Sequence, residues 1–168
     1  MCNQSGAGMT NLQQTSPDTW LDAVIAASDE TSERFLDLGK IEVLGKSNAL
    51  PDVATASLVS LTSESTSVLV GVAASSEACQ VISKSLLGMG LDEENLPTDD
   101  VIDALGEMVN IVAGSVKQRI VDVGGESTVP GLPLVLYGKP LLTNRHWVLS
   151  AECVIGPVQA YLLTICPK

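Results

Sequence analysis

Residues that carry the common enzyme chemistries are scarce in this sequence. It has one histidine, His146, which begins a predicted strand and is expected to be a surface or structural residue. It contains no glycine-rich phosphate loop, no nucleophile elbow and no zinc-binding helix with paired histidines. Its four cysteines are far apart and lack metal-ligand spacing. We therefore expect no metal or other cofactor of the chain's own, and an autonomous hydrolase is disfavoured.

Basic residues are scarce as well. The sequence has 9 lysines and arginines against 20 aspartates and glutamates, which gives a formal net charge of −11. Nucleic acids and anionic membranes are bound through basic surfaces, so we expect neither as a partner. No apolar run approaches the roughly 18 residues of a membrane-spanning helix, and the start has no basic-then-apolar secretory signal. We expect a cytoplasmic protein, because widely spaced cysteines suit a reducing compartment.

Aromatic residues make up only 3% of the chain and apolar residues 45%, so we expect a core of valine, leucine, isoleucine and alanine. The 168 residues suffice for one domain that buries about two-thirds of its unfolded surface. Residues 1–15 are rich in small polar side chains, which predicts a flexible tail holding Cys2, followed by a single domain over residues 16–168. The remaining cysteines fall within apolar patterns and are expected in the core: Cys79, Cys153 and Cys166.

Apolar periodicity and end signals predict three helices, over residues 17–38, about 76–88 and 97–120. The expected N-caps are Ser16 for the first helix, Ser75 or Ser76 for the second and Thr98 for the third. The first helix is expected to pack on the core and to expose an acidic face: Asp29, Glu30 and Glu33.

Strand patterns are expected in six places: residues 41–44, 54–61, 67–73, 133–137, 145–154 and 158–166. The second and third form a predicted hairpin, and so do the last two. Residues 68–72 are apolar on both faces, which is typical of a central strand. Because strands arrive as hairpins separated by helices, we predict an α+β fold with a largely antiparallel sheet covered by long helices.

The helix over residues 97–120 carries a second pattern outside its buried face. Asp103, Glu107, Asn110 and Gly114 are spaced four, three and four apart, so they lie on one side. Glycine inside a helix costs roughly 0.8–1 kcal/mol relative to alanine. Gly106 and Gly114 therefore predict that a neighbouring element, a second subunit or a partner comes close. A carboxylate and an amide one turn apart can pair with a cation and hold a water, although such a stripe is also typical of plain solvated surface.

The spacing Asp103-x3-Glu107-x2-Asn110, followed after twenty-two residues by Pro133, resembles the signature of the CheC/CheX/FliY chemotaxis phosphatases. The string GEMVNIVAG resembles their catalytic helix, and LPLVLYG resembles the strand and turn that follow it. The resemblance implies a CheC-like fold and a phosphatase that accelerates hydrolysis of the phospho-aspartate of a CheY-like response regulator. The regulator would supply Mg²⁺. With one motif rather than two, the chain looks more like CheX, whose members work as homodimers.

The resemblance also implies a role for each motif residue. Asn110 would orient the attacking water, and Glu107 would dock to the lysine of the regulator's active site. Asp103 would tune the helix surface or contact the regulator, and Gly114 would leave room beside Asn110. Pro133 would hold the backbone next to the catalytic helix.

Two other functions stay open at this point. One is a non-catalytic CheC-like binding or scaffold module for a response regulator or a flagellar-switch-type partner. The other is a small-ligand sensor with a cleft between helices and sheet, for which the sequence offers no positive sign.

Overall fold

The computed structural model describes residues 15–138 and 144–168. Cys2 and the predicted tail, apart from Thr15, lie outside these residues. The predicted α+β class is confirmed: three helices accompany a seven-stranded sheet in which every described pairing is antiparallel. The helices are α1 (Pro17–Arg34), α2 (Ser76–Leu86) and α3 (Thr98–Asp122). The strands are β1 (Glu42–Ser47), β2 (Thr55–Thr62), β3 (Ser67–Ala74), β4 (Val129–Pro130), β5 (Leu134–Tyr137), β6 (His146–Ile155) and β7 (Val158–Pro167).

Both predicted hairpins are present, as β2–β3 and β6–β7. The strand order is β1-β6-β7-β3-β2-β4, and β5 also pairs with β2. The prediction of a central strand at residues 68–72 is confirmed, because β3 lies between β7 and β2. The two-residue strand β4, which pairs with the end of β2, was not predicted.

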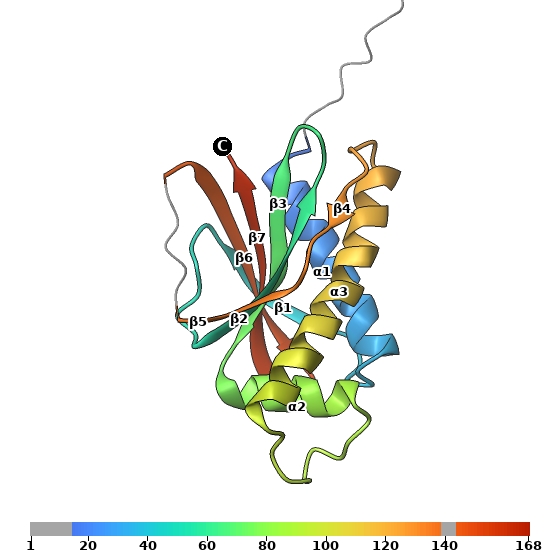
Figure 1. The fold of residues 1–168 in the computed structure, drawn as a ribbon, viewed down its shortest axis with the longest axis vertical. Helices are drawn as coiled ribbons and strands as arrows, with labels where there is room; N and C mark the ends of the chain where they lie inside the picture. Colours follow the sequence, from blue (N-terminus) through green and yellow to red (C-terminus); the bar gives the residue numbers. More distant parts are fainter. Residues whose placement is uncertain (1–14, 139–143) are drawn as a thin grey trace, which may run out of the picture.

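The helices form a layer on one face of the sheet. Figure 1 shows α1 and α3 side by side along the sheet, with α2 at the end where α3 begins. α1 packs on β6 and β7, α3 packs on β2 and β3, and α1 and α3 also contact each other. The main core lies between these layers and is built from aliphatic side chains such as Leu21, Met108, Val112 and Leu162. No helix within the described part of the chain has both the length and the apolarity to cross a membrane.

The ends of two helices differ from the prediction. α1 stops at Arg34, four residues before the predicted end at Leu38, because Asp37 takes a left-handed φ of 53° that a helix cannot continue through. Thr98 is not a cap: Pro97 occupies the N-cap position of α3, and no side chain caps that end. The predicted caps Ser16 and Ser75 are confirmed. The Ser16 hydroxyl accepts a hydrogen bond from the backbone N–H of Thr19, and the Ser75 hydroxyl accepts one from the backbone N–H of Ala78.

The predicted acidic face of α1 is only partly exposed. Asp29 is half-buried and its carboxylate accepts a hydrogen bond from the backbone N–H of Ile41 at 2.9 Å. Glu30 is half-buried as well and contacts α3, whereas Glu33 is exposed as predicted. The three cysteines predicted for the core are all buried, which confirms that prediction: Cys79, Cys153 and Cys166.

Candidate functional site

α3 lies close to the sheet at the turn that contains Gly106. A Cβ added to this buried glycine would lie 3.4 Å from both Cβ and Cγ of Pro133, the residue just before β5. At the same turn, the buried Ser57 of β2 donates a hydrogen bond to the carbonyl of Leu105 at 3.4 Å. The close approach predicted for this glycine is therefore made within the chain, by the segment that leads into β5.

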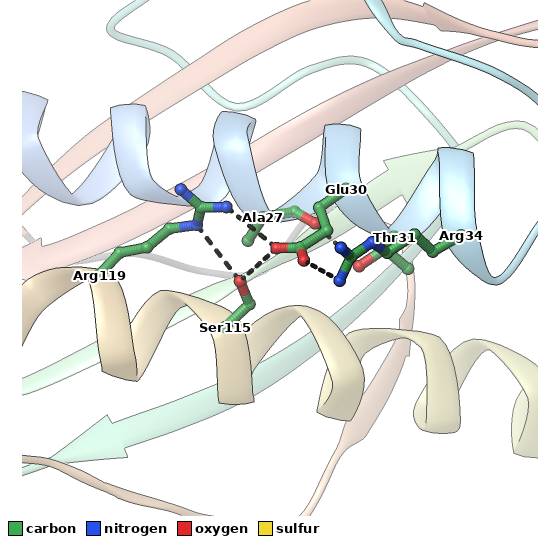
Figure 2. A network of polar contacts seen from close by, with 6 residues as sticks. All are labelled: Ala27, Glu30, Thr31, Arg34, Ser115 and Arg119. Carbon is green, nitrogen blue, oxygen red and sulfur yellow. Dashed lines mark hydrogen bonds and ion pairs between the residues drawn. The ribbon is translucent and has the colours of Figure 1, made fainter.

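The opposite flank of α3 is held by α1 through a cluster of polar contacts (Figure 2). The guanidinium of Arg119 donates to Glu30 at 3.0 Å and to the hydroxyl of Ser115 at 3.2 Å. Ser115 also donates to Glu30 at 3.3 Å, and Arg34 forms an ion pair with the same carboxylate at 2.7 Å. These groups are about one-third or more exposed, so each pair contributes less than about 1 kcal/mol. Together they still fix which side of α3 turns toward α1.

The predicted stripe occupies the face of α3 that is left between these two flanks. Asp103, Glu107, Asn110 and Gly114 are all exposed. Within residues 15–138 and 144–168, the three polar side chains form no hydrogen bond or ion pair. The arrangement is thus a carboxylate and an amide one turn apart, on a helix secured from both sides, with their hydrogen-bonding groups turned to solvent.

The two helical glycines differ in their surroundings. Whereas Gly106 faces Pro133, a Cβ added to Gly114 would have no atom within 4 Å. Gly114 follows Asn110 by four residues, so it leaves open space on the same face. Pro133 is half-buried against Gly106, which itself precedes Asn110 by four residues. The five residues singled out from the sequence therefore gather around two turns of α3.

Two contacts that hold α3 escaped the sequence analysis. Glu30 and Arg119 are 89 residues apart, and no local pattern pairs them. The sequence alone indicates only the ion pair within α1, because Glu30 and Arg34 have the i,i+4 spacing of neighbours on a helix. Ser57 shares the inner face of β2 with Thr55, Val59 and Leu61, and a buried hydroxyl on that face indicates that it has a polar partner. His146 begins β6, where it is half-buried and away from α3.

Comparison with known proteins agrees with this architecture. The fold is that of the CheC-like chemotaxis proteins, an antiparallel sheet with its helices on one face. A family model described as chemotaxis phosphatase CheX matches residues 55–156, which is more than half of the chain. The chain belongs to the CheX family.

Several solved structures share the fold at low sequence identity. A CheC-like superfamily protein from Shewanella sp. PV-4 has a TM-score of 0.73 at 15% identity, covering 89% of this chain and 98% of that one. CheX from Vibrio vulnificus has a TM-score of 0.73 at 14% identity, covering 88% and 98%. CheX from Borrelia burgdorferi, in a complex with CheY, BeF₃ and Mg²⁺, has a TM-score of 0.69 at 13% identity, covering 89% and 98%. No curated protein matches the sequence.

Proposed function

We propose that this protein accelerates hydrolysis of the phospho-aspartate of a CheY-like response regulator. The observation that carries the proposal is the pair Glu107 and Asn110, exposed one turn apart on a helix held on both flanks. Two comparisons support it: the family is one of chemotaxis phosphatases, and a CheX of the same fold has been crystallised with CheY.

The chemistry asks little of the protein beyond positioning. In an acyl phosphate the carboxylate is a good leaving group, and phosphoryl transfer passes through a loose transition state. A water attacks phosphorus, the bond from phosphorus to the aspartate oxygen breaks, and inorganic phosphate leaves the regenerated carboxylate. The amide of Asn110 both donates and accepts, so it can hold that water in line with the breaking bond. The Mg²⁺ that neutralises phosphoryl charge arrives as part of the regulator.

Glu107 acts in docking rather than in proton transfer. Its carboxylate pairs with the lysine of the regulator's active site, which brings the amide of Asn110 to the phosphoryl group. Asp103, one turn earlier on the same exposed face, lies where it contacts the regulator's rim. Gly114 keeps the space beside Asn110 open, and Pro133 supports α3 by packing against Gly106.

We also propose a cytoplasmic homodimer, for which an edge strand such as β1 offers unpaired backbone groups.

The test is to time the loss of phosphate from CheY-like receiver domains phosphorylated with acetyl phosphate and Mg²⁺. The wild-type protein should accelerate the loss. Asn110→Ala should lower kcat by about 10²–10³, the usual cost of one positioned transition-state group, and Glu107→Ala should also raise KM. Glu33→Ala, an exposed change on α1 that leaves α3 unaltered, is the matched control.

A kcat unchanged by Asn110→Ala would contradict the proposal. Binding of the receiver without any acceleration by the wild type would instead favour a non-catalytic module of the same fold. Sedimentation that shows only a 17.5 kDa species at micromolar concentration would remove the homodimer.

A further inference from the structure

A cavity of about 590 Å³ lies at the end of the molecule where α1 begins. Figure 1 shows the start of α1, the β2–β3 turn and the end of β7 together at this end. All the described residues that line the cavity lie outside α3, so the cavity is separate from the face that carries Glu107 and Asn110. Its size is within the usual range of small-molecule sites, about 300–1,000 Å³. The side chains in its wall therefore decide which ligand it can take.

Both tryptophans of the chain line this cavity, although aromatic residues make up only 3% of the sequence. Trp20 of α1 lines it from the core, where its side chain is 3% exposed. Trp147 of β6 is opposite Cys166 of β7 in the strand register, and Cys166 is a core residue. Directly opposed residues of a sheet share a face, so the Trp147 side chain lies on the helix side of the sheet, and it is 52% exposed. The cavity therefore has one buried indole and one exposed indole.

The exposed indole already holds a cation. Nζ of Lys168 lies 4.9 Å from the centroid of the Trp147 ring, and the face of an indole attracts an ammonium within about 6 Å. Lys168 is the one basic residue among the described residues that line the cavity. Its backbone N–H donates to the carbonyl of Arg145 at 2.8 Å, which holds it next to the start of β6. The contact shows that the Trp147 ring is accessible to a positive charge.

A carboxylate lines the cavity as well. Glu126 accepts hydrogen bonds at Oε2 from the hydroxyls of Ser63 and Ser65, the second at 2.7 Å. These two bonds hold the pKa of Glu126 below its ordinary value, so the group is ionised at neutral pH. A carboxylate has about four acceptor positions, so Glu126 retains capacity for a donor from a ligand. It is the one acidic residue among the described residues in the wall.

We propose that the cavity binds a small organic ammonium ion, with its charged group recognised by the Trp147 ring and the Glu126 carboxylate. The apolar part of the ligand packs against Trp20 and Val68, which line the cavity from the core. The ammonium of the ligand takes the position that Nζ of Lys168 occupies on the ring, so Lys168 is an internal competitor. This binding function is independent of the proposed phosphatase activity.

Two other classes of ligand fit these side chains less well. A metal ion needs several carboxylate, imidazole or thiolate ligands, and the described part of the chain has no group of three such residues placed to hold one. An anion would be repelled by Glu126 and by the net charge of −11, and the lysine nearby is already placed on an indole. The charges therefore select an organic cation.

The test is a titration with choline, followed by tryptophan fluorescence, because both indoles of the chain line the cavity. We expect a saturable change. Dimethylbutanol, the neutral isostere of choline, should bind roughly tenfold more weakly, because it cannot form the cation–π contact. Isothermal titration calorimetry with the same two ligands measures Kd independently of fluorescence. Sodium chloride at equal concentration controls for ionic strength.

Substitutions in the cavity should change the Kd for choline in different directions. Trp147→Leu should raise it roughly tenfold, measured by calorimetry and by the fluorescence of Trp20, and Trp147→Phe should raise it less. Glu126→Gln should raise it roughly twofold to fivefold. Glu33→Gln, which removes the charge of an exposed carboxylate on α1 outside the cavity, should leave it unchanged. Lys168→Gln should lower it, because the internal competitor is removed.

A Kd for choline equal to that for dimethylbutanol would overturn the proposal, because the cavity would then select an apolar ligand rather than a charge. The proposal also fails if neither method detects saturable binding. A Kd unchanged in both Trp147→Leu and Trp147→Phe, with circular dichroism showing that the variants are folded, would contradict it as well. If Lys168→Gln weakens binding, the proposal is wrong, because the lysine would then support the site instead of competing for the ring.

Discussion

Gly106 is the residue at which α3 and the segment before β5 come closest, and substitutions there have opposite expected effects according to size. A Cβ at this position would lie 3.4 Å from two carbons of Pro133, which is ordinary van der Waals contact. Gly106→Ala therefore fits without displacement. It should stabilise the protein by up to about 0.8–1 kcal/mol, the difference in helix propensity between the two residues.

Gly106→Val adds two methyl groups beyond the Cβ, and the Cβ already lies in contact with Pro133, so both methyl groups overpack this buried position. Overpacking of this kind costs about 1–3 kcal/mol, because either α3 or the proline must move. The displacement affects the turn that carries Glu107 and Asn110, so kcat should fall as well. Pro133→Ala removes the ring that meets the valine, and the double variant should recover part of the loss in stability and in kcat.

The assays are urea unfolding, followed by circular dichroism, and the rate of phosphate loss from a phosphorylated receiver domain. The wild type, Gly106→Val, Pro133→Ala and the double variant form a double-mutant cycle. In it Gly106 and Pro133 should show a coupling energy of about 0.5–1.5 kcal/mol. A destabilising Gly106→Ala, or a Gly106→Val as stable and active as the wild type, would refute the reasoning. A cycle with no coupling would show that Pro133 is not what the larger side chain meets.

Three further predictions concern other parts of the fold. Glu30→Ala removes the acceptor shared by α1 and α3, so it should lower the free energy of unfolding by about 1 kcal/mol in low salt and by less at 1 M salt, measured by urea unfolding. Lys84→Met should cost about 2–3 kcal/mol in the same assay, because its buried ammonium donates to two carbonyls and the side-chain oxygen of Asn95; an unchanged midpoint would show that these bonds are dispensable. Burial raises the pKa of the Cys79 thiol to about 11 and the pKa values of the Cys153 and Cys166 thiols to about 12. In the unfolded chain these thiols lose their protons from about pH 9, while in the folded protein they keep them. The contribution of the protonated thiols to the free energy of unfolding is therefore fully present below pH 9 and should be lost as pH rises toward 11–12, measured by urea unfolding at each pH. The fall should be shallower in Cys153→Ala.

The sequence by itself determined the local features. A period near 3.6 places Leu105 and Met108 in the core and Glu107 and Asn110 outside it, whatever packs against the helix. Alternation of apolar residues and short turns likewise determined the two hairpins, since their partners are neighbours in the chain. Local rules were less reliable at helix ends, where the left-handed Asp37 ended α1 early and Pro97 rather than Thr98 preceded α3.

Only the tertiary structure decided how the helix is held and what borders it. Glu30 looked like part of an exposed acidic face, but it is the acceptor for an arginine 89 residues away. Nothing local brings Pro133 to Gly106 or pairs β5 with β2: the rest of α3 and β4 separate the first two, and β3, α2, α3 and β4 separate the second two. A periodic pattern states which face of an element is buried; the identity of the segment that covers it depends on how the whole chain packs. The flanks of the Glu107 and Asn110 face, polar on one side and apolar on the other, are for that reason properties of the fold.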